Sequence, residues 1–168
     1  RRGMIKSPPP NGLLFASFSD GYDDGVVPLD DKVKRLDQLK RNGSKALADL
    51  IVSTAKKQHI VYTLLLPWAA DVARELHLPS TLLWIQPAMV LDIYYYYFNG
   101  FANVIRNDNN DYPSSSIKLP GLPLLTSRDL PSFFLASNPH TFALPMFQAH
   151  LEVLEKESNP RILVNTFD

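Results

Sequence analysis

Few side chains in this sequence are spaced for acid–base, nucleophilic or metal chemistry. The chain has no cysteine, which excludes disulfides and cysteine-based zinc or iron–sulfur sites. Asp23 and Asp24 fall in a turn, where carboxylates usually accept hydrogen bonds from nearby amides. No GxGxxG, GxxxxGK[ST], HExxH or GxSxG motif occurs. The histidines are scattered, and no two share one helix face as a ligand pair would: His59, His77, His140 and His150.

The clearest local pattern is residues 59–88, HIVYTLLLPWAADVARELHLPSTLLWIQPA, which reads as strand, turn, helix, loop and strand. Residues 60–66 are almost uninterrupted apolar residues, and this predicts a strand buried on both faces, as in a parallel sheet. Pro67 suits the first position of a helix, where no amide donor is needed. The turn itself carries no Asp, Glu, His or Cys that could move a proton.

Further elements alternate along the chain. Short apolar runs predict strands over 13–20, 80–85 and 161–167, of which the last should be buried. Apolar residues at steps of three and four predict helices over 30–57, 87–98 and 138–158. Residues 117–134 hold three prolines and predict an ordered, irregular loop, while Pro145 predicts a kink or a late helix start. The alternation predicts an α/β fold with a Rossmann-like parallel sheet flanked by helices.

In open sheets of this kind, ligands bind beyond the carboxyl ends of the strands. We therefore expect a site at a rim formed by residues 17–20, 62–66, 84–87 and the proline-rich loop. This rim is mostly apolar and aromatic, with a few hydroxyl and amide groups. Such a lining predicts a flat, hydrophobic small-molecule ligand.

The run IYYYYFNGF, residues 93–101, admits two interpretations. A helix cannot bury four consecutive tyrosines on one face, so at least one phenol must reach solvent or a pocket. The run either packs in the core with one exposed ring, or forms a wall that stacks on an aromatic ligand. Asp92 in the same helix is expected on the surface.

The composition is that of an ordinary globular protein, with 45% apolar and 20% charged residues. The formal net charge of zero gives no indication of a nucleic-acid partner. No apolar run is long enough for a membrane span, and the absence of cysteine suits a reducing, cytoplasmic location. The chain starts without Met and stops directly after an apolar run, which suggests an internal piece of a longer protein.

Four stretches together resemble one family: FASFSDGYDDG, PWAADVARELHLPSTLLWIQPA, LPGLPLLTSRDLPSFF and ILVNTFD. They are similar to the amino-terminal domain of plant family 1 UDP-sugar glycosyltransferases. Within that family, they are most similar to the branch of crocetin glucosyltransferases and anthocyanin 5-O-glucosyltransferases. The resemblance spans nearly the whole chain, so residues 1–168 are expected to form a partial acceptor-binding domain.

The resemblance implies a GT-B fold, in which one Rossmann-like domain holds the acceptor and a second holds the UDP-sugar. It implies an inverting glucosyltransferase that acts on a hydrophobic plant molecule, uses UDP-glucose as donor and needs no cofactor or metal. The catalytic histidine would lie in a strand before Arg1, and the donor-binding box would lie beyond Asp168. The isolated chain is therefore expected to be inactive, and its parent to be a monomer. A non-catalytic small-molecule-binding module on the same half-fold is the alternative.

Counting from the PWA motif places individual residues. The family's base-orienting aspartate falls five residues before Trp68, where this chain has Thr63. Leu65 and Leu66 fall at the pocket lining that follows it. A threonine can hydrogen-bond an imidazole but cannot stabilise imidazolium by charge. We hypothesise that the parent tolerates this substitution because its acceptor is acidic, as a carboxylic acid or a flavonoid phenol is.

The resemblance also places residues at the end of the next strand. Trp84, Ile85 and Gln86 fall near the transferred sugar and the acceptor. Gln86 is the best polar candidate there, because its amide can donate and accept hydrogen bonds. Capping of the helix that begins at Pro87 is an equally plausible role for Gln86.

Overall fold

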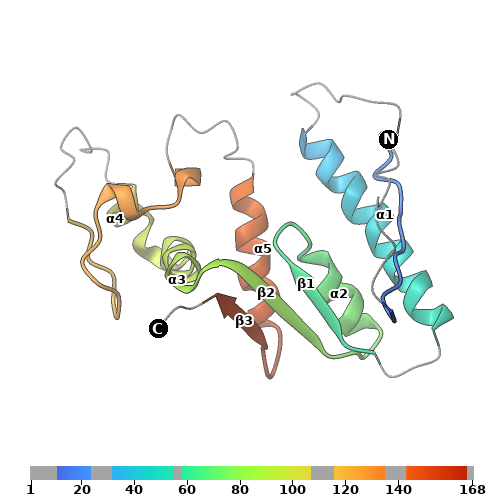
Figure 1. Ribbon diagram of the computed structural model, residues 1–168. Helices are drawn as coiled ribbons and strands as arrows, with labels where there is room; N and C mark the ends of the chain where they lie inside the picture. Colours follow the sequence, from blue (N-terminus) through green and yellow to red (C-terminus); the bar gives the residue numbers. More distant parts are fainter. Residues whose placement is uncertain (1–10, 24–31, 55–57, 107–115, 135–142, 166–168) are drawn as a thin grey trace. The chain divides into compact units, whose positions relative to one another are not determined.

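The computed structural model describes residues 11–23, 32–54, 58–106, 116–134 and 143–165 (Figure 1). The chain divides into two compact units, Arg1–Gln58 and His59–Asp168, which are described separately below. None of the helices in the described ranges is long and apolar enough to cross a bilayer.

The first unit contains one long helix, α1 (Lys32–Ser53), which confirms the predicted helix and runs through Gly43 without interruption. Gly43 is buried within it. The strand predicted over 13–20 is wrong, because these residues form no ladder and nearly all of them are exposed. A strand needs a hydrogen-bonded neighbouring strand, and within the described residues no strand pairs with this apolar segment.

The second unit is built on a parallel sheet in the order β1-β2-β3. The strands are β1 (Ile60–Thr63), β2 (Ser80–Pro87) and β3 (Ile162–Asn165). In the register, Tyr62 pairs with Leu82 and Leu82 pairs with Ile162. The sheet confirms the predicted parallel topology, and its three carboxyl ends meet at one edge.

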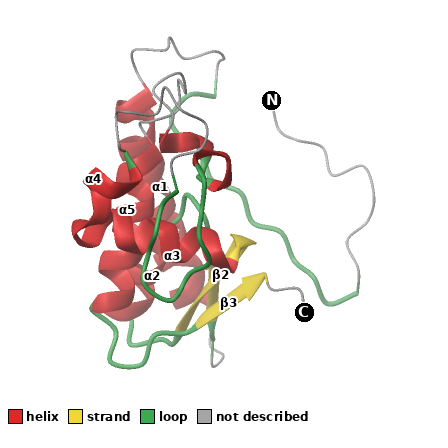
Figure 2. Cartoon of the chain, turned by 90° about the vertical axis from the view of Figure 1, so that its left-hand side faces the viewer, coloured by secondary structure: helices red, strands yellow, loops and turns green. Residues whose placement is uncertain are grey.

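Helices α2 (Trp68–Glu75) and α5 (Leu144–Glu155) lie on one face of this sheet (Figure 2). Tyr62 and Trp84 point from the strands into this layer, where they contact His150 and Phe147 of α5. Pro67 precedes α2 as predicted, and Pro145 lies in the first turn of α5, which therefore starts late and is not kinked. The main core of the unit lies between the sheet and these helices.

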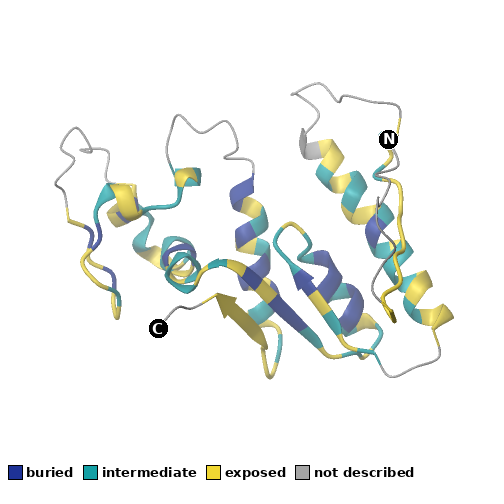
Figure 3. Ribbon diagram, viewed as in Figure 1, coloured by how far each residue is buried: buried dark blue, intermediate teal, exposed yellow. Residues whose placement is uncertain are grey.

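The opposite face of the sheet is open in the second unit (Figure 3). The exposed fractions of Val61, Ile85 and Leu163 are 56%, 57% and 54%. The prediction that both faces of the first strand are buried is therefore wrong, as is the prediction of a buried final strand: every residue of β3 is exposed. An apolar run indicates a preference for burial, but the helices described in the second unit pack on one side of the sheet only.

A second, smaller core forms beside the sheet. Helix α3 (Ala88–Tyr96) continues through the π-turn η2 (Tyr97–Phe101) into α4 (Ala102–Ile105), with a break at Asn99 and Gly100. Residues 116–134 fold over these helices as an irregular ordered loop, as predicted, with 3-10 turns η3 (Ser127–Asp129) and η4 (Ser132–Phe134). The buried members of this core come from both segments: Ile93, Ile105, Ile117, Leu119 and Leu125.

Candidate functional site

The carboxyl edge of the sheet is where a ligand site is expected in this architecture. Here β1 ends at Thr63, and the last pairs across β2 are Thr63 with Leu83 and Pro87 with Asn165. The candidate residues Thr63, Leu65, Leu66, Trp84, Ile85 and Gln86 all lie at the ends of β1 and β2 or directly after β1. The fold therefore brings the predicted residues of the second unit to one edge.

Thr63 is fixed across the two strands. Its Oγ1 donates a hydrogen bond to the carbonyl oxygen of Leu83 at 3.0 Å. This uses the only hydroxyl proton and leaves the oxygen lone pairs able to accept a hydrogen bond, for example from an imidazole N–H. Thr63 can thus orient a base as an acceptor, but it brings no negative charge.

The turn after Thr63 holds an unusual backbone conformation. The amide of Leu66 donates to the carbonyl of Thr63 at 3.2 Å, and Leu65 inside this turn has a φ of 74°. A turn with positive φ at this position normally takes glycine or asparagine, and a leucine there costs about 1 kcal/mol. The side chain of Leu65 is half exposed. Strain of this kind persists where the surrounding structure enforces it, which is common at functional sites.

The end of β2 contains a bulge. Trp84 pairs with Val164, but the next pair is Pro87 with Asn165, so Ile85 and Gln86 interrupt the ladder. A bulge redirects side chains and is frequent beside active sites. The indole of Trp84 is only 1% exposed. Its Nε1 donates to the carbonyl of Pro87 at 3.2 Å, and this hydrogen bond connects the two residues that flank the bulge.

The two bulged residues differ in what they offer a ligand. Ile85 is well exposed. Gln86 is half buried, and its Oε1 is buried with no hydrogen-bond partner among the described residues. A buried amide oxygen without a partner costs free energy, so a bound donor group would stabilise it. No side-chain cap to α3 is present, which argues against the capping role considered for Gln86.

The tyrosine run mainly packs in the core. Tyr94 is fully buried, stacks on Phe147 at 4.2 Å between ring centroids, and has its pKa raised by burial. Tyr96 donates to the carbonyl of Pro120 at 2.7 Å and so fixes the proline-rich loop, while Tyr97 packs on Phe134. Tyr95 is 46% exposed, which confirms that one phenol reaches solvent.

The histidines in the described residues do not lie at the carboxyl edge. His59 precedes β1 at the amino edge, where its Nε2 lies 2.7 Å from Oγ1 of Thr81. His77 ends α2 near the same edge, and His150 is fully buried in α5. His140 and Asp24 lie outside the described residues. Asp92 is exposed as expected, although partial burial raises the pKa of its carboxyl. Within the described ranges, no group of three or more potential metal ligands occurs.

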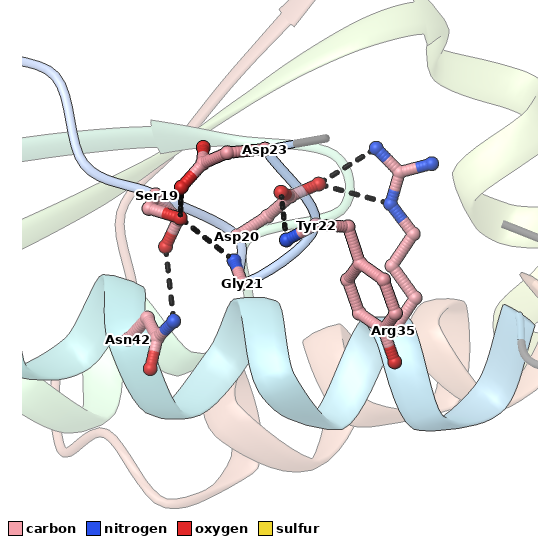
Figure 4. Close-up of polar contacts among 7 residues, drawn as sticks. All are labelled: Ser19, Asp20, Gly21, Tyr22, Asp23, Arg35 and Asn42. Atoms are coloured by element: carbon pink, nitrogen blue, oxygen red, sulfur yellow. Dashed lines mark hydrogen bonds and ion pairs between the residues drawn. The ribbon is translucent and has the colours of Figure 1, made fainter. Parts of the chain in front are cut away.

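The remaining rim segment, residues 17–20, belongs to the first unit, where it forms a turn on α1 (Figure 4). Asp20 accepts hydrogen bonds from Nε and an Nη of Arg35 at 2.9 and 2.6 Å, and this lowers the pKa of its carboxyl. Ser19 Oγ donates to Asp23 at 2.6 Å, which supports the local role predicted for Asp23. Gly21 has a φ of 88°, so the turn requires glycine. This constellation explains the FSDGYD segment as a structural turn.

Comparisons with known proteins give a consistent picture, although no protein-family model matches the chain. The chain is 57% identical to phloretin 4'-O-glucosyltransferase of Malus domestica over 95% of its length and 35% of that enzyme's. It is 52% identical to the chloroplastic crocetin glucosyltransferase of Gardenia jasminoides, with coverages of 95% and 35%. It is 49% identical to anthocyanidin 3-O-glucoside 5-O-glucosyltransferase of Verbena hybrida, with coverages of 94% and 35%.

The fold comparison agrees. The crystal structure of Os79 from O. sativa in complex with UDP, in its Q202A form, matches with a TM-score of 0.68 at 24% identity. The match covers 97% of this chain and 38% of that one. The chain therefore has the predicted α/β fold of part of a GT-B glycosyltransferase, and the predicted resemblance is confirmed. It spans about a third of the length of the curated relatives that it matches.

Proposed function

We propose that this chain, which is homologous over nearly its whole length to plant UDP-glycosyltransferases, forms the acceptor-binding part of a UDP-glucose-dependent glucosyltransferase. The complete enzyme would transfer glucose, with inversion, to a hydroxyl or carboxyl group of a hydrophobic plant molecule. The observation that carries this proposal is the 57% identity to phloretin 4'-O-glucosyltransferase over 95% of the chain. Flavonoids, anthocyanins and apocarotenoids such as crocetin are the acceptor classes that the relatives' names suggest.

The carboxyl edge supplies distinct roles to the proposed site. Leu65, Leu66 and Ile85 would line it with apolar surface, and two of these side chains are half or more exposed. The unpartnered Oε1 of Gln86, which is buried in the structure, would accept a hydrogen bond from an acceptor hydroxyl after the side chain turns towards the ligand. Trp84 would act from the core, because its bond to Pro87 holds the bulge that presents Gln86.

Thr63 would replace the carboxylate that orients the catalytic base. Its oxygen would accept a hydrogen bond from the imidazole, whose second nitrogen would remove the proton of the acceptor. Without a carboxylate the imidazolium is less stabilised, so an acceptor that is already acidic would suit this site best. In the complete enzyme, Thr63→Asp should raise the rate on alcohol acceptors and leave carboxylate acceptors little changed. Equal gains on both acceptor classes would disprove this role.

Acceptor binding by the 168-residue chain tests the proposed site directly. Titration with phloretin, followed by ligand-observed NMR, should give saturable binding. Gln86→Leu should weaken this binding about tenfold, as expected for the loss of one hydrogen bond to a ligand. Val61→Thr, at an exposed position on the same sheet, is the matched control and should not change the affinity.

Two outcomes would contradict the proposal. If phloretin, crocetin and an anthocyanidin glucoside all fail to bind saturably, the chain does not contain the proposed acceptor site. If Gln86→Leu and Val61→Thr change the affinity for phloretin equally, the acceptor does not bind at the carboxyl edge of the sheet. The isolated chain should not turn over UDP-glucose, because the resemblance places the catalytic base and the donor site in other segments of the enzyme. Turnover by the isolated chain would refute this assignment.

The proposal includes a monomeric enzyme in the cytoplasm that needs no metal. Size-exclusion chromatography of the complete protein and cell fractionation test the first two statements. Unchanged activity in the presence of a chelator tests the third.

A further inference from the structure

Three asparagines in the described residues are followed directly by glycine, and their settings differ. They are Asn11, Asn42 and Asn99. Glycine has no Cβ, so its backbone nitrogen can approach the side-chain amide of the preceding asparagine with little hindrance. Attack of this nitrogen on the amide carbon is the route by which asparagine deamidates without an enzyme. Whether it occurs depends on how firmly the local backbone is held.

Asn42 is held firmly. It lies inside the continuous helix α1, and its Nδ2 donates to the carbonyl of Ser19 at 3.0 Å. Its Oδ1 accepts from Nε2 of Gln38 at 3.1 Å, and the following Gly43 is buried. Cyclisation there would require the helix to open and both side-chain bonds to break.

Asn99 lies in an open and irregular setting. It is exposed, and its φ and ψ of −109° and 45° are not helical. Gly100 follows with a φ of 94°, and no atom lies within 4 Å of the place where a Cβ would stand. This break separates α3 from α4, so the pair sits outside regular helical backbone. The exposed Asn11 precedes Gly12, which has a φ of 88° and equally open surroundings.

We propose that Asn99 is a site of spontaneous covalent modification, at which deamidation places a negative charge at the α3–α4 junction. The Gly100 nitrogen loses its proton and bonds to Cγ of Asn99. The bond from Cγ to Nδ2 breaks, and Nδ2 leaves as ammonia. Water then opens the cyclic imide at either carbonyl, which gives aspartate or isoaspartate. The net change is the gain of one water and the loss of one ammonia, without oxidation or reduction.

The product differs from Asn99 in its hydrogen bonding. In the structure, Nδ2 of Asn99 donates to the carbonyl of Tyr95, in the last turn of α3, at 2.9 Å. A carboxylate has no proton to donate, and it adds negative charge beside the negative end of the helix dipole. Isoaspartate also lengthens the backbone at the break. Modification at Asn99 should therefore loosen the junction that carries the tyrosine run, whereas modification at Asn11 should not.

The experiment is incubation of the purified 168-residue chain at physiological temperature and mildly alkaline pH, followed by peptide mapping with mass spectrometry. Asn99 should convert at least about tenfold faster than Asn42, which corresponds to a local opening free energy of about 1.4 kcal/mol or more for α1. Asn11 is the internal reference for an exposed Asn–Gly pair. Enzymatic methylation of isoaspartyl groups identifies the isomer.

Two variants separate the chemistry from its consequence. Asn99→Gln keeps the amide but needs a larger ring to cyclise, so it should abolish conversion at this position. Asn99→Asp imitates one product and should lower the Tm relative to the unmodified chain. Conversion of Asn42 at the rate of Asn99, or an intact Asn99 while Asn11 converts, would overturn the proposed site. An unchanged Tm for Asn99→Asp would overturn its structural effect.

Discussion

The buried imidazole of His150 makes the stability of the second unit depend on pH. Its exposed fraction is zero, and its ring stacks on Tyr62 with centroids 5.9 Å apart and planes 9° apart. Neither ring nitrogen has a hydrogen-bond partner among the described residues. Burial therefore disfavours the charged form and lowers the pKa of His150 from 6.5 to about 4.

The sign of the effect follows from proton binding. As the pH falls below 6.5, the unfolded chain binds a proton at this histidine before the folded chain does, so acid favours unfolding. The stabilisation is complete above pH 6.5 and is lost as the pH falls to about 4. The lowered pKa corresponds to a loss of about 3 kcal/mol of unfolding free energy over the whole range, of which about 2 kcal/mol is lost by about pH 5.

Other groups around the stack do not produce the same profile. Burial, with smaller contributions from Glu157 and Asp71, raises the pKa of the Tyr62 phenol to about 12, so this ring stays neutral throughout. His150 experiences desolvation without a charged neighbour that shifts its pKa. The loss between pH 6.5 and about 4 should therefore come largely from one imidazole.

Urea unfolding at a series of pH values measures this profile. His150→Phe keeps an aromatic ring in the stack and removes the titrating group, so its free energy of unfolding should lose most of the pH dependence in this range. His77→Asn, which removes an exposed histidine, is the matched control and should retain the slope. If His150→Phe and the parent chain lose stability in parallel as the pH falls, the assignment to His150 is wrong.

Three further substitutions test features of the fold by urea unfolding. His77 has a φ of 55° and ends α2 in a Schellman motif, so His77→Gly should stabilise the chain by about 1 kcal/mol; a loss of stability would contradict this. Thr63→Val removes the bond to Leu83 and should cost about 1 kcal/mol, and a neutral result would show that the bond contributes nothing. Gly21→Ala would place a Cβ 2.8 Å from Cγ of Gln38 at positive φ and should cost about 1–2 kcal/mol, so tolerance would refute the turn geometry.

Local sequence signals predicted the elements of the second unit well. Pro67 and Pro87 mark the starts of α2 and α3 because proline needs no donor there, and the apolar run after Pro79 is β2. The irregular loop over 116–134 follows from its prolines. These features depend on neighbouring residues, which a single sequence contains in full.

Burial and site geometry were harder to predict. Val61 and Leu163 are apolar but exposed, because the described helices of the second unit cover only one face of the sheet. Residues 13–20 lack a partner strand among the described residues. The bulge at Ile85 and Gln86 depends on the register of β3, some eighty positions further along the chain. The left-handed conformation of Leu65 has no signal in its residue type, since leucine normally avoids it.

The proline-rich loop shares a small hydrophobic core with α3 and α4, and the hydrogen bond from Tyr96 to the carbonyl of Pro120 ties the loop to α3. Residues 88–106 and 116–134 therefore share a set of contacts between themselves, and Tyr94 additionally joins them to Trp84 of β2 and Phe147 of α5. A chimera that carries the corresponding stretch of a relative should fold, provided that both halves of the small core are exchanged together and the packing of Tyr94 on Trp84 and Phe147 is kept.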